Sequence, residues 1–216
     1  MIPPLTIKPR SMYVYFIKPV FGWVAALVSL VLLSPFFLVI ALILSLKNHG
    51  KVFFFQERPG LHEKPFLLLK FKTLLDSVDE NGNLLPDIRR QFGFGSLLRH
   101  FHLDELPQFI NILKGELDFI GPRPLLVEYL PYYSPVQKTR HDIKPGIIGL
   151  SQVSGGNKLT WPQRLRLDVF YVKHQSFGLD CLITWRTFKY FFQKNRKPDE
   201  GSIFSAESFV DYLGKD

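Results

Sequence analysis

The chain has 216 residues and a formal net charge of +8, which suits one domain and three kinds of partner: nucleic acid, anionic lipid or phosphorylated small molecules. Its 21 phenylalanines favour a membrane-associated protein over a soluble nucleic-acid binder. The single cysteine, Cys181, excludes an internal disulfide.

The first long segment, residues 20–46, contains no charged residue. As a straight helix its 27 residues would measure about 40 Å, against roughly 30 Å for the hydrocarbon core of a bilayer. Hydropathy alone therefore predicts one spanning helix.

Ser34 and Pro35 interrupt this segment near its middle. Pro35 removes a backbone donor and crowds the carbonyl of Val31, and we expect the Ser34 hydroxyl to bond the carbonyl of Leu30. Both flanks are basic, which is typical of cytoplasmic ends. The flanking charges are Lys8, Arg10 and Lys18 before the segment, and Lys47, Lys51 and Arg58 after it. We therefore predict a helix-break-helix that enters one leaflet and returns.

Two β-prone runs follow, residues 52–56 and 66–71, and the Pro-Gly sequence between them predicts a hairpin with a long loop. Lys70 and Lys72 would share one face of the second strand. That face is either a solvated edge or a contact for a phosphate or headgroup. A helix with an interruption around Gly93 and Gly95 is expected over residues 89–102.

The central segment contains the adjacent acids Asp104 and Glu105. Pro107 is tolerated only in a first turn, so a helix is expected to begin near Asp104 and to end at Gly115. Asp104 is either the N-cap of this helix or a catalytic carboxylate.

A stiff arginine segment follows, because Pro122 and Pro124 flank Arg123. A carboxylate at a helix start, a second acid and a stiffened arginine together form a plausible site for the phosphates of a nucleotide.

The residue patterns in the last third of the chain predict two more helices. Residues 161–174 place Asp168 on an apolar face, where a buried acid needs a partner such as an arginine. Residues 182–197 mix aromatic and basic side chains, which is typical either of an interfacial amphipathic helix or of a core-packed helix with a basic solvated face.

Several motifs in order resemble the bacterial sugar transferase family, the monotopic polyprenyl-phosphate phosphoglycosyl transferases. They are Leu-Asp-Glu-Leu-Pro-Gln (103–108), Asn-Ile-Leu-Lys-Gly-Glu-Leu (111–117), Phe-Ile-Gly-Pro-Arg-Pro (119–124) and Lys-Pro-Gly-Ile (144–147). The similarity runs from about Lys18 to Leu182. Leu150 replaces a tryptophan of the usual pattern and Gly156 a frequent arginine, which weakens any claim of nucleobase stacking or an extra anion contact there.

The resemblance and the residues together predict a predominantly α fold with a small β-hairpin, around a cytosolic catalytic core. We expect an N-terminal segment and re-entrant hairpin (1–47), a catalytic domain with interfacial helices (48–197) and a tail without an assigned role (198–216). The expected location is the cytoplasmic face of the bacterial inner membrane, as a monotopic protein in contact with membrane lipid. A monomer and a homodimer both stay open.

The resemblance implies transfer of a sugar 1-phosphate from a UDP-sugar to undecaprenyl phosphate, with release of UMP, as the first membrane step of glycoconjugate synthesis. We hypothesise that Asp104 is the nucleophile, and that Glu105 holds Mg²⁺ beside it. Arg99 and Arg140 match family positions. The residues expected to bind substrate phosphate are Arg99, Arg123, Arg140 and Lys70, with Asp168, Pro122 and Pro124 in support. For Arg140, a structural ion pair is an equal alternative.

Two other functions stay open. One is the same reaction through a ternary complex, with Asp104 as a general base. The other is a non-catalytic adaptor whose basic face binds anionic lipid. No nucleic-acid partner is expected, because the sequence lacks a recognised binding motif and contains the apolar segment.

Overall fold

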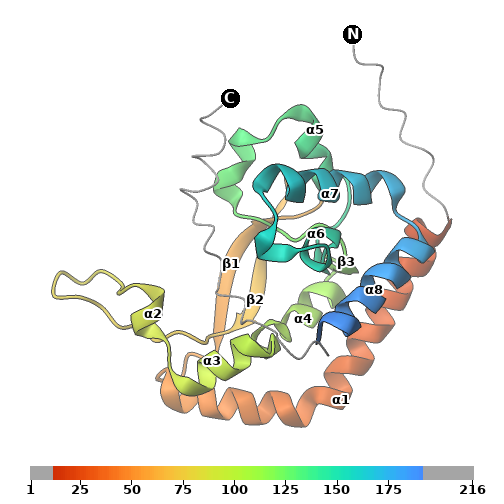
Figure 1. The fold of residues 1–216 in the computed structure, drawn as a ribbon. Helices are drawn as coiled ribbons and strands as arrows, with labels where there is room; N and C mark the ends of the chain where they lie inside the picture. The colour runs from red at the N-terminus through yellow and green to blue at the C-terminus, as the bar shows by residue number, and fades with distance from the viewer. Residues whose placement is uncertain (1–11, 192–216) are drawn as a thin grey trace.

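The structure is a computed structural model that describes residues 12–191 (Figure 1). The predicted tail 198–216 lies outside the described residues. So do residues 192–197 of the predicted amphipathic helix and two of the flanking charges, Lys8 and Arg10. The described fold is mostly helical and contains two small two-stranded sheets, so the predicted fold class is confirmed at this level.

A short π-helical segment, η1 (Tyr13–Ile17), leads directly into the long apolar helix α1 (Lys18–Lys47). This is the one described helix that is long and apolar enough to cross a membrane. Figure 1 shows that α1 bends near its middle and passes along the body of the protein. Pro35 lies inside the helix. The Ser34 hydroxyl donates to the carbonyl of Val31 at 2.8 Å, and not to Leu30 as predicted.

The identity of this acceptor has a simple cause. Pro35 has no N–H, so the carbonyl four residues earlier, that of Val31, loses its helical donor. The Ser34 hydroxyl replaces that donor, which satisfies the carbonyl at the bend.

The predicted β-hairpin is confirmed. Strand β1 (Phe53–Pro59) pairs antiparallel with β2 (Pro65–Phe71), and the first strand extends three residues further than expected. The turn η2 (Leu61–Glu63) closes the hairpin, with His62 in the left-handed region. Phe66 and Leu68 on β2 are buried in a core cluster with Ala26 of α1.

The acid-bearing segment lies between this hairpin and α1. Helices α2 (Asp87–Arg90) and α3 (Gly93–His100) precede it, so the helical break falls just before Gly93 rather than between the two glycines. The expected helix from Asp104 is in fact a 3₁₀ turn, η3 (Leu103–Glu105), followed by α4 (Gln108–Leu113). Gly115 ends it with φ +77°, as predicted.

Asn111 fixes α4 against the edge of β2. Its amide nitrogen donates to the carbonyl of Leu67 at 2.8 Å, and its oxygen accepts from the backbone N–H of Leu69 at 3.0 Å. The side chain therefore takes the place of a neighbouring strand, and it sets the distance between the acidic turn and Lys70 on β2.

A second, parallel pair of short strands was not predicted: β3 (Asp118–Ile120) and β4 (Gly146–Ile148). The chain between and after them forms η4 (Val127–Tyr132), α5 (Pro135–Lys138), η5 (Thr139–His141), α6 (Leu150–Val153), η6 (Gly156–Lys158), α7 (Trp161–His174) and α8 (Phe177–Phe191). Gly146 is required here, because a Cβ at this position would lie 2.1 Å from the backbone nitrogen of Gly121.

A buried polar cluster joins the first turn of helix α8 to the start of α1. The Lys18 ammonium lies 3.0 Å from Asp180 and donates to the carbonyl of Ile120 at 2.7 Å. Tyr13 and Tyr171 both donate to the Asp180 carboxylate, at 2.7 and 2.6 Å. The start of α1 is therefore fixed to β3, α7 and α8.

Helix α8 begins at Phe177, five residues before the predicted start of the amphipathic helix. Ile183 is fully buried, whereas several apolar and basic side chains are exposed: Phe177, Leu182, Trp185, Arg186, Phe188 and Lys189. The helix is thus amphipathic, as expected, and its position at a membrane interface stays a prediction.

Candidate active site

Glu105 is the most strongly held acid of the central turn. It is buried, and it accepts hydrogen bonds from Lys70 at 2.7 Å and from both terminal nitrogens of Arg123, one of them at 3.2 Å. Burial by itself would raise the pKa of Glu105. The charges and hydrogen bonds of Arg123 and Lys70 outweigh this effect and hold the pKa well below its usual range. Glu105 is therefore a fixed anion that aligns two cations.

Asp104 is in the opposite situation. Its carboxylate accepts no hydrogen bond and forms no ion pair within residues 12–191, and neither η3 nor α4 has a side-chain cap. The N-cap alternative for Asp104 is therefore wrong. Burial raises its pKa, and the neighbouring Glu105 raises it further, whereas Lys70, Arg123 and Arg99 lower it. An unpaired carboxylate of raised basicity among cations has the character of a nucleophile or a base.

Arg123 owes its position to a rigid backbone. Pro122 and Pro124 are both buried. The N–H of Gly146 donates to the carbonyl of Pro122 at 3.0 Å, and the guanidinium of Arg140 donates to the carbonyl of Arg123 at 2.8 Å. The main chain on both sides of this arginine is therefore anchored to β4 and η5.

Arg140 and Asp168 form a buried ion pair. The guanidinium donates to the Asp168 carboxylate at 2.7 and 3.3 Å, and the Ser151 hydroxyl donates to the other carboxylate oxygen at 3.0 Å. Both side chains are almost fully enclosed. Of the two predicted roles of Arg140, the structural ion pair describes this arrangement. We regard Arg140 and Asp168 as positioning residues that act through the carbonyl of Arg123, and the phosphate contact of Arg140 stays a prediction.

Arg99, on α3, lies near Asp104, and its charge lowers the pKa of that acid. One of its terminal nitrogens is buried and has no hydrogen-bond partner in the described part of the chain. A buried donor without an acceptor fits the predicted role in anion binding. The structure thus brings together Lys70, Arg99, Asp104, Glu105 and Arg123, and it leaves Arg140 and Asp168 behind them.

Arg58 is a further cation of this site that the sequence analysis counted only as a flanking charge. It lies on β1 near Arg123, whose charge lowers its pKa. The strand period alone could not have found it, because Arg58 and Lys70 share one face only in the observed register of the two strands.

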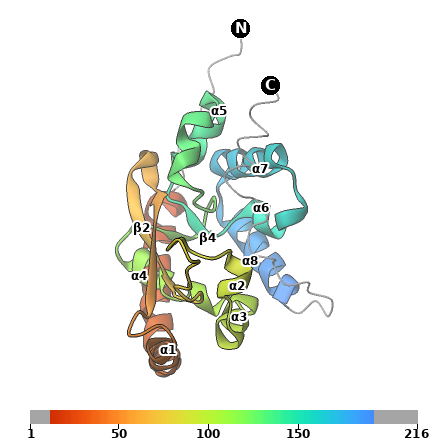
Figure 2. The same cartoon turned by 90° about the vertical axis from the view of Figure 1, so that its left-hand side faces the viewer.

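An apolar groove of about 370 Å³ ends next to the acidic turn. It lies between the second half of α1 and helix α3, which are adjacent at the lower end of the molecule (Figures 1 and 2). It is lined by Pro35, Phe36, Val39, Ile40, Phe94, Leu97, Leu98 and Leu103. Leu103 directly precedes Asp104, so the groove reaches from the bend of α1 to the residue next to the acid.

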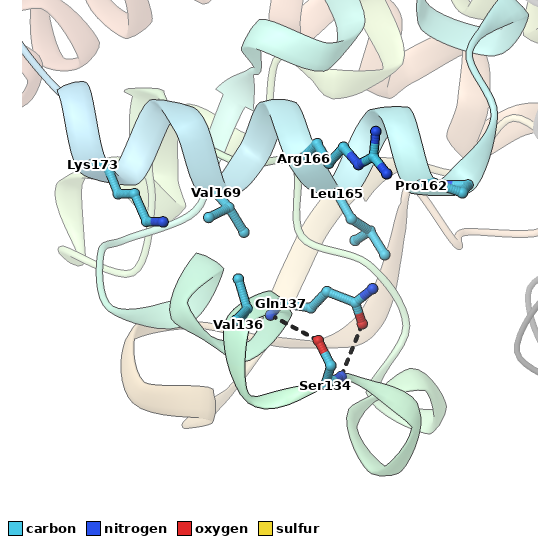
Figure 3. Close-up of a pocket in the computed structure, with 8 residues that line it drawn as sticks. All are labelled: Ser134, Val136, Gln137, Pro162, Leu165, Arg166, Val169 and Lys173. Carbon is cyan, nitrogen blue, oxygen red and sulfur yellow. Dashed lines mark hydrogen bonds between the residues drawn. The ribbon is translucent and has the colours of Figure 1, made fainter. Parts of the chain in front are cut away.

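A second hollow, of about 390 Å³, lies between α5 and α7 and contains none of the predicted site residues. Figure 3 shows Leu165 and Val169 of α7 facing the capping box that Ser134 and Gln137 form at the start of α5. Figures 1 and 2 place α5 and α7 at the opposite end of the molecule from the bend of α1. This hollow is therefore separate from the acidic turn.

Comparisons with known proteins show which family this chain resembles. A sequence model described as bacterial sugar transferase matches residues 13–194. The uncharacterized sugar transferase EpsL of Bacillus subtilis is 47% identical over 77% of this chain and 83% of its own length. A UDP-N-acetylgalactosamine-undecaprenyl-phosphate N-acetylgalactosaminephosphotransferase of Aeromonas hydrophila is 32% identical, over 85% of this chain but 45% of its own length.

The UDP-glucose:undecaprenyl-phosphate glucose-1-phosphate transferase of Escherichia coli is 34% identical over 89% of this chain and 44% of its own length. This chain therefore spans less than half of the two relatives that are named for a complete reaction. The family match covers nearly all of the described residues, and the acidic turn contacts the arginine segment. The chain therefore belongs to the bacterial sugar transferase family and is an enzyme of the phosphoglycosyl transferase type.

Proposed function

We propose that the protein transfers a sugar 1-phosphate from a UDP-sugar to undecaprenyl phosphate and releases UMP. The observation that carries this proposal is the unpaired carboxylate of Asp104 beside Glu105, which is itself fixed by Lys70 and Arg123. Relatives of the same family are named for this reaction with two different sugars.

The reaction proceeds in two displacements. An oxygen of Asp104 attacks the phosphorus that bears the sugar, the bond to the bridging oxygen breaks, and UMP leaves with the electron pair. An oxygen of undecaprenyl phosphate then attacks the same phosphorus, and the bond to Asp104 breaks. The carboxylate is restored, and the product is an undecaprenyl diphosphate sugar. Arg99 and Arg123 stabilise the negative charge that develops on the phosphate oxygens.

The oxygen donors of the acidic turn fit Mg²⁺. Within residues 12–191 no three His, Cys, Asp or Glu side chains form a ready metal site. However, Mg²⁺ commonly takes only one or two carboxylates and completes its shell with substrate phosphates and water. Asp104 is unpaired, and Glu105 keeps a free lone pair beside the three hydrogen bonds it accepts. When bound there, Mg²⁺ neutralises charge on the donor diphosphate.

The placement of α1 supports a re-entrant, monotopic protein on the cytoplasmic face. Lys18 at its start bonds the carbonyl of Ile120, and Asn48 just after its end donates to the carbonyl of Lys72 at 2.9 Å. Both ends of the helix are thus tied to the same folded body. A straight spanning helix would separate its ends by the thickness of the bilayer.

This topology can be tested with cysteine labelling in cells. In a Cys181→Ser background, a cysteine at Met12 and a cysteine at Lys51 are both expected to react only with a reagent that reaches the cytoplasm. Labelling of the Met12 position from the outside would contradict the re-entrant arrangement.

The apolar groove beside α3 provides room for the first isoprene units of the acceptor. Its lining residues belong to the bend of α1 and to α3, and the groove ends at Leu103. A lipid phosphate at the end of the groove would lie near Arg99 and Asp104. This geometry brings an insoluble acceptor to a polar site without removing it from the bilayer.

The experiment that tests the function is a panel of UDP-sugars, including UDP-glucose and UDP-N-acetylgalactosamine, with undecaprenyl phosphate and Mg²⁺. Release of UMP with at least one donor is expected, and its absence with every donor would favour the lipid adaptor. Exchange of labelled UMP into the donor without lipid is possible only by the covalent route, so its absence would favour Asp104 as a general base.

Lys70→Met is expected to move the acidic limb of the pH profile to higher pH. Among the neighbouring charges, that of Lys70 lowers the pKa of Asp104 most, so its removal raises the pKa of an acid that must be ionised to attack. The ionised fraction of Asp104 at a given pH therefore falls, and the acidic limb of the profile moves to higher pH. The measurement is kcat/KM for UMP release against pH, with Lys51→Met as the control, because Lys51 pairs with the exposed Asp76. An unchanged limb would show that Asp104 does not titrate in the reaction.

A further inference from the structure

Arg58 faces the interior of the site because of the hairpin register. Directly opposite residues of an antiparallel pair have their side chains on one face, and the pairs here include Arg58 with Phe66 and Lys70 with Phe54. Phe66 on this face is buried in the core, and Lys70 on the same face contacts Glu105. Arg58 and Lys70 therefore lie at two ends of one face, about 13 Å apart along the strand.

The guanidinium of Arg58 is only partly used by the protein. One terminal nitrogen donates to the side chain of Gln56 at 2.5 Å. Its Nε is buried without a hydrogen-bond partner among the described residues, and none of the ion pairs in residues 12–191 includes Arg58. Burial lowers its pKa to about 10 together with the charge of Arg123, and Tyr129, Glu128 and Glu105 offset this only in part. Arg58 is thus a half-buried cation beside a second arginine, and no carboxylate among the described residues forms an ion pair with it.

The charges of the site require more negative charge than the protein supplies. Four cations lie around the acidic turn, namely Lys70, Arg99, Arg123 and Arg58, against three acids, Asp104, Glu105 and, near Arg58, Glu128. The sum, four minus three, leaves a net charge of +1. A nucleoside diphosphate sugar has two ionised phosphates that supply negative charge, and bound Mg²⁺ would increase the need for it.

The position of Arg58 also gives the donor a direction. Lys70 and Arg123 meet at Glu105, and Arg58 lies beyond Arg123, whereas Arg99 and the apolar groove lie on the side of α3. In each displacement the entering and the leaving oxygen lie on opposite sides of the phosphorus. The nucleotide therefore leaves, and the lipid phosphate later attacks, on the same side, opposite Asp104. The lipid chain takes the apolar groove, so the rest of the nucleotide extends from this position toward the hairpin.

We propose that Arg58 binds the phosphate of the departing nucleotide, at the end of the site opposite the apolar groove. This assignment rests on the proposed function. As the bond between the two phosphates breaks, negative charge develops on the oxygen that leaves with the nucleotide, and Arg58 with Arg123 faces that oxygen. The nucleotide extends from this position toward the hairpin, whereas the lipid extends along the groove, so we assign Arg58 to the donor and not to the lipid acceptor.

The test compares Arg58→Gln and Arg58→Lys with Arg89→Gln in the full-length protein in lipid nanodiscs. Arg89 is an exposed arginine of α2 outside the site. The KM for the UDP-sugar is expected to rise about tenfold to a hundredfold in Arg58→Gln, as for the loss of a charged hydrogen bond. The KM for undecaprenyl phosphate is expected to stay unchanged. Arg58→Lys keeps the charge but loses the planar fork, so an intermediate KM is expected.

Stabilisation by UDP gives a second readout that does not need turnover. UDP is expected to raise the Tm of the wild type and of Arg89→Gln, and to leave the Tm of Arg58→Gln unchanged. If Arg58→Gln does not fold, Arg58→Lys carries the same comparison. The assignment of Arg58 would be overturned if UDP raised the Tm of the Arg58 variants as much as that of the wild type. It would also be overturned if only the KM for undecaprenyl phosphate rose. A wild type that neither responds to UDP nor releases UMP would overturn the proposed function with it.

Discussion

Asp104→Asn is expected to lower UMP release on the order of 10⁴-fold or more, the scale that removal of a nucleophile produces in other covalent enzymes. The amide has nearly the same shape but cannot form the acyl phosphate bond. Because the Asp104 carboxylate has no partner within residues 12–191, the substitution breaks no observed contact and should leave the Tm close to that of the wild type. Labelled sugar phosphate should be trapped on the wild type and not on the variant.

The matched control is Asp87→Asn, at an exposed acid at the start of α2 that pairs with Arg90 at 3.4 Å. It is expected to keep wild-type turnover and trapping. Unchanged turnover in Asp104→Asn would refute the nucleophile. A large loss of turnover without any trapped adduct on the wild type would instead favour the general base.

Much of the local structure could be predicted from the sequence, because it depends on neighbouring residues. Pro-Gly between two β-prone runs predicted the hairpin, Gly115 predicted the end of a helix, and the apolar spacing around Asp168 predicted its buried partner. These features follow from backbone restrictions and side-chain periodicity, which a sequence states directly.

What the sequence did not show depends on contacts between distant segments. The strands β3 and β4 have three residues each, too few for a periodic pattern, and they form because the backbones of Gly121 and Gly146 approach closely. Arg58 joins the site only through the register of the hairpin. The helix expected from Asp104 became a 3₁₀ turn, with the left-handed His102 directly before it.

The role of Arg140 shows the same limit. A motif match placed it near the phosphates, but the chain uses its guanidinium to hold Asp168 and the carbonyl of Arg123. Resemblance identifies which residues belong to a site. Only the packing shows which of them are free to touch a substrate and which of them position another residue.

Arg140→Met is expected to lower the free energy of unfolding by about 3–5 kcal/mol, because it leaves the Asp168 carboxylate buried without its cation. For a chain of this length that corresponds to a fall in Tm of roughly 6–20 °C. The carbonyl of Arg123 also loses its donor, so the KM for the UDP-sugar is expected to rise as Arg123 moves. Arg166→Met, at an exposed arginine of α7, is the control and should change neither value.

The double variant Arg140→Met/Asp168→Leu separates stability from positioning. Replacing both buried charges with apolar side chains is expected to recover most of the lost stability. It does not restore a donor to the carbonyl of Arg123, so the donor KM should stay raised although the Tm recovers. If the double variant regained both, the pair would be structural only. If Arg140→Met kept the wild-type Tm and only raised the KM for the UDP-sugar, Arg140 would contact the substrate phosphate. Its ion pair with Asp168 would then break when substrate binds.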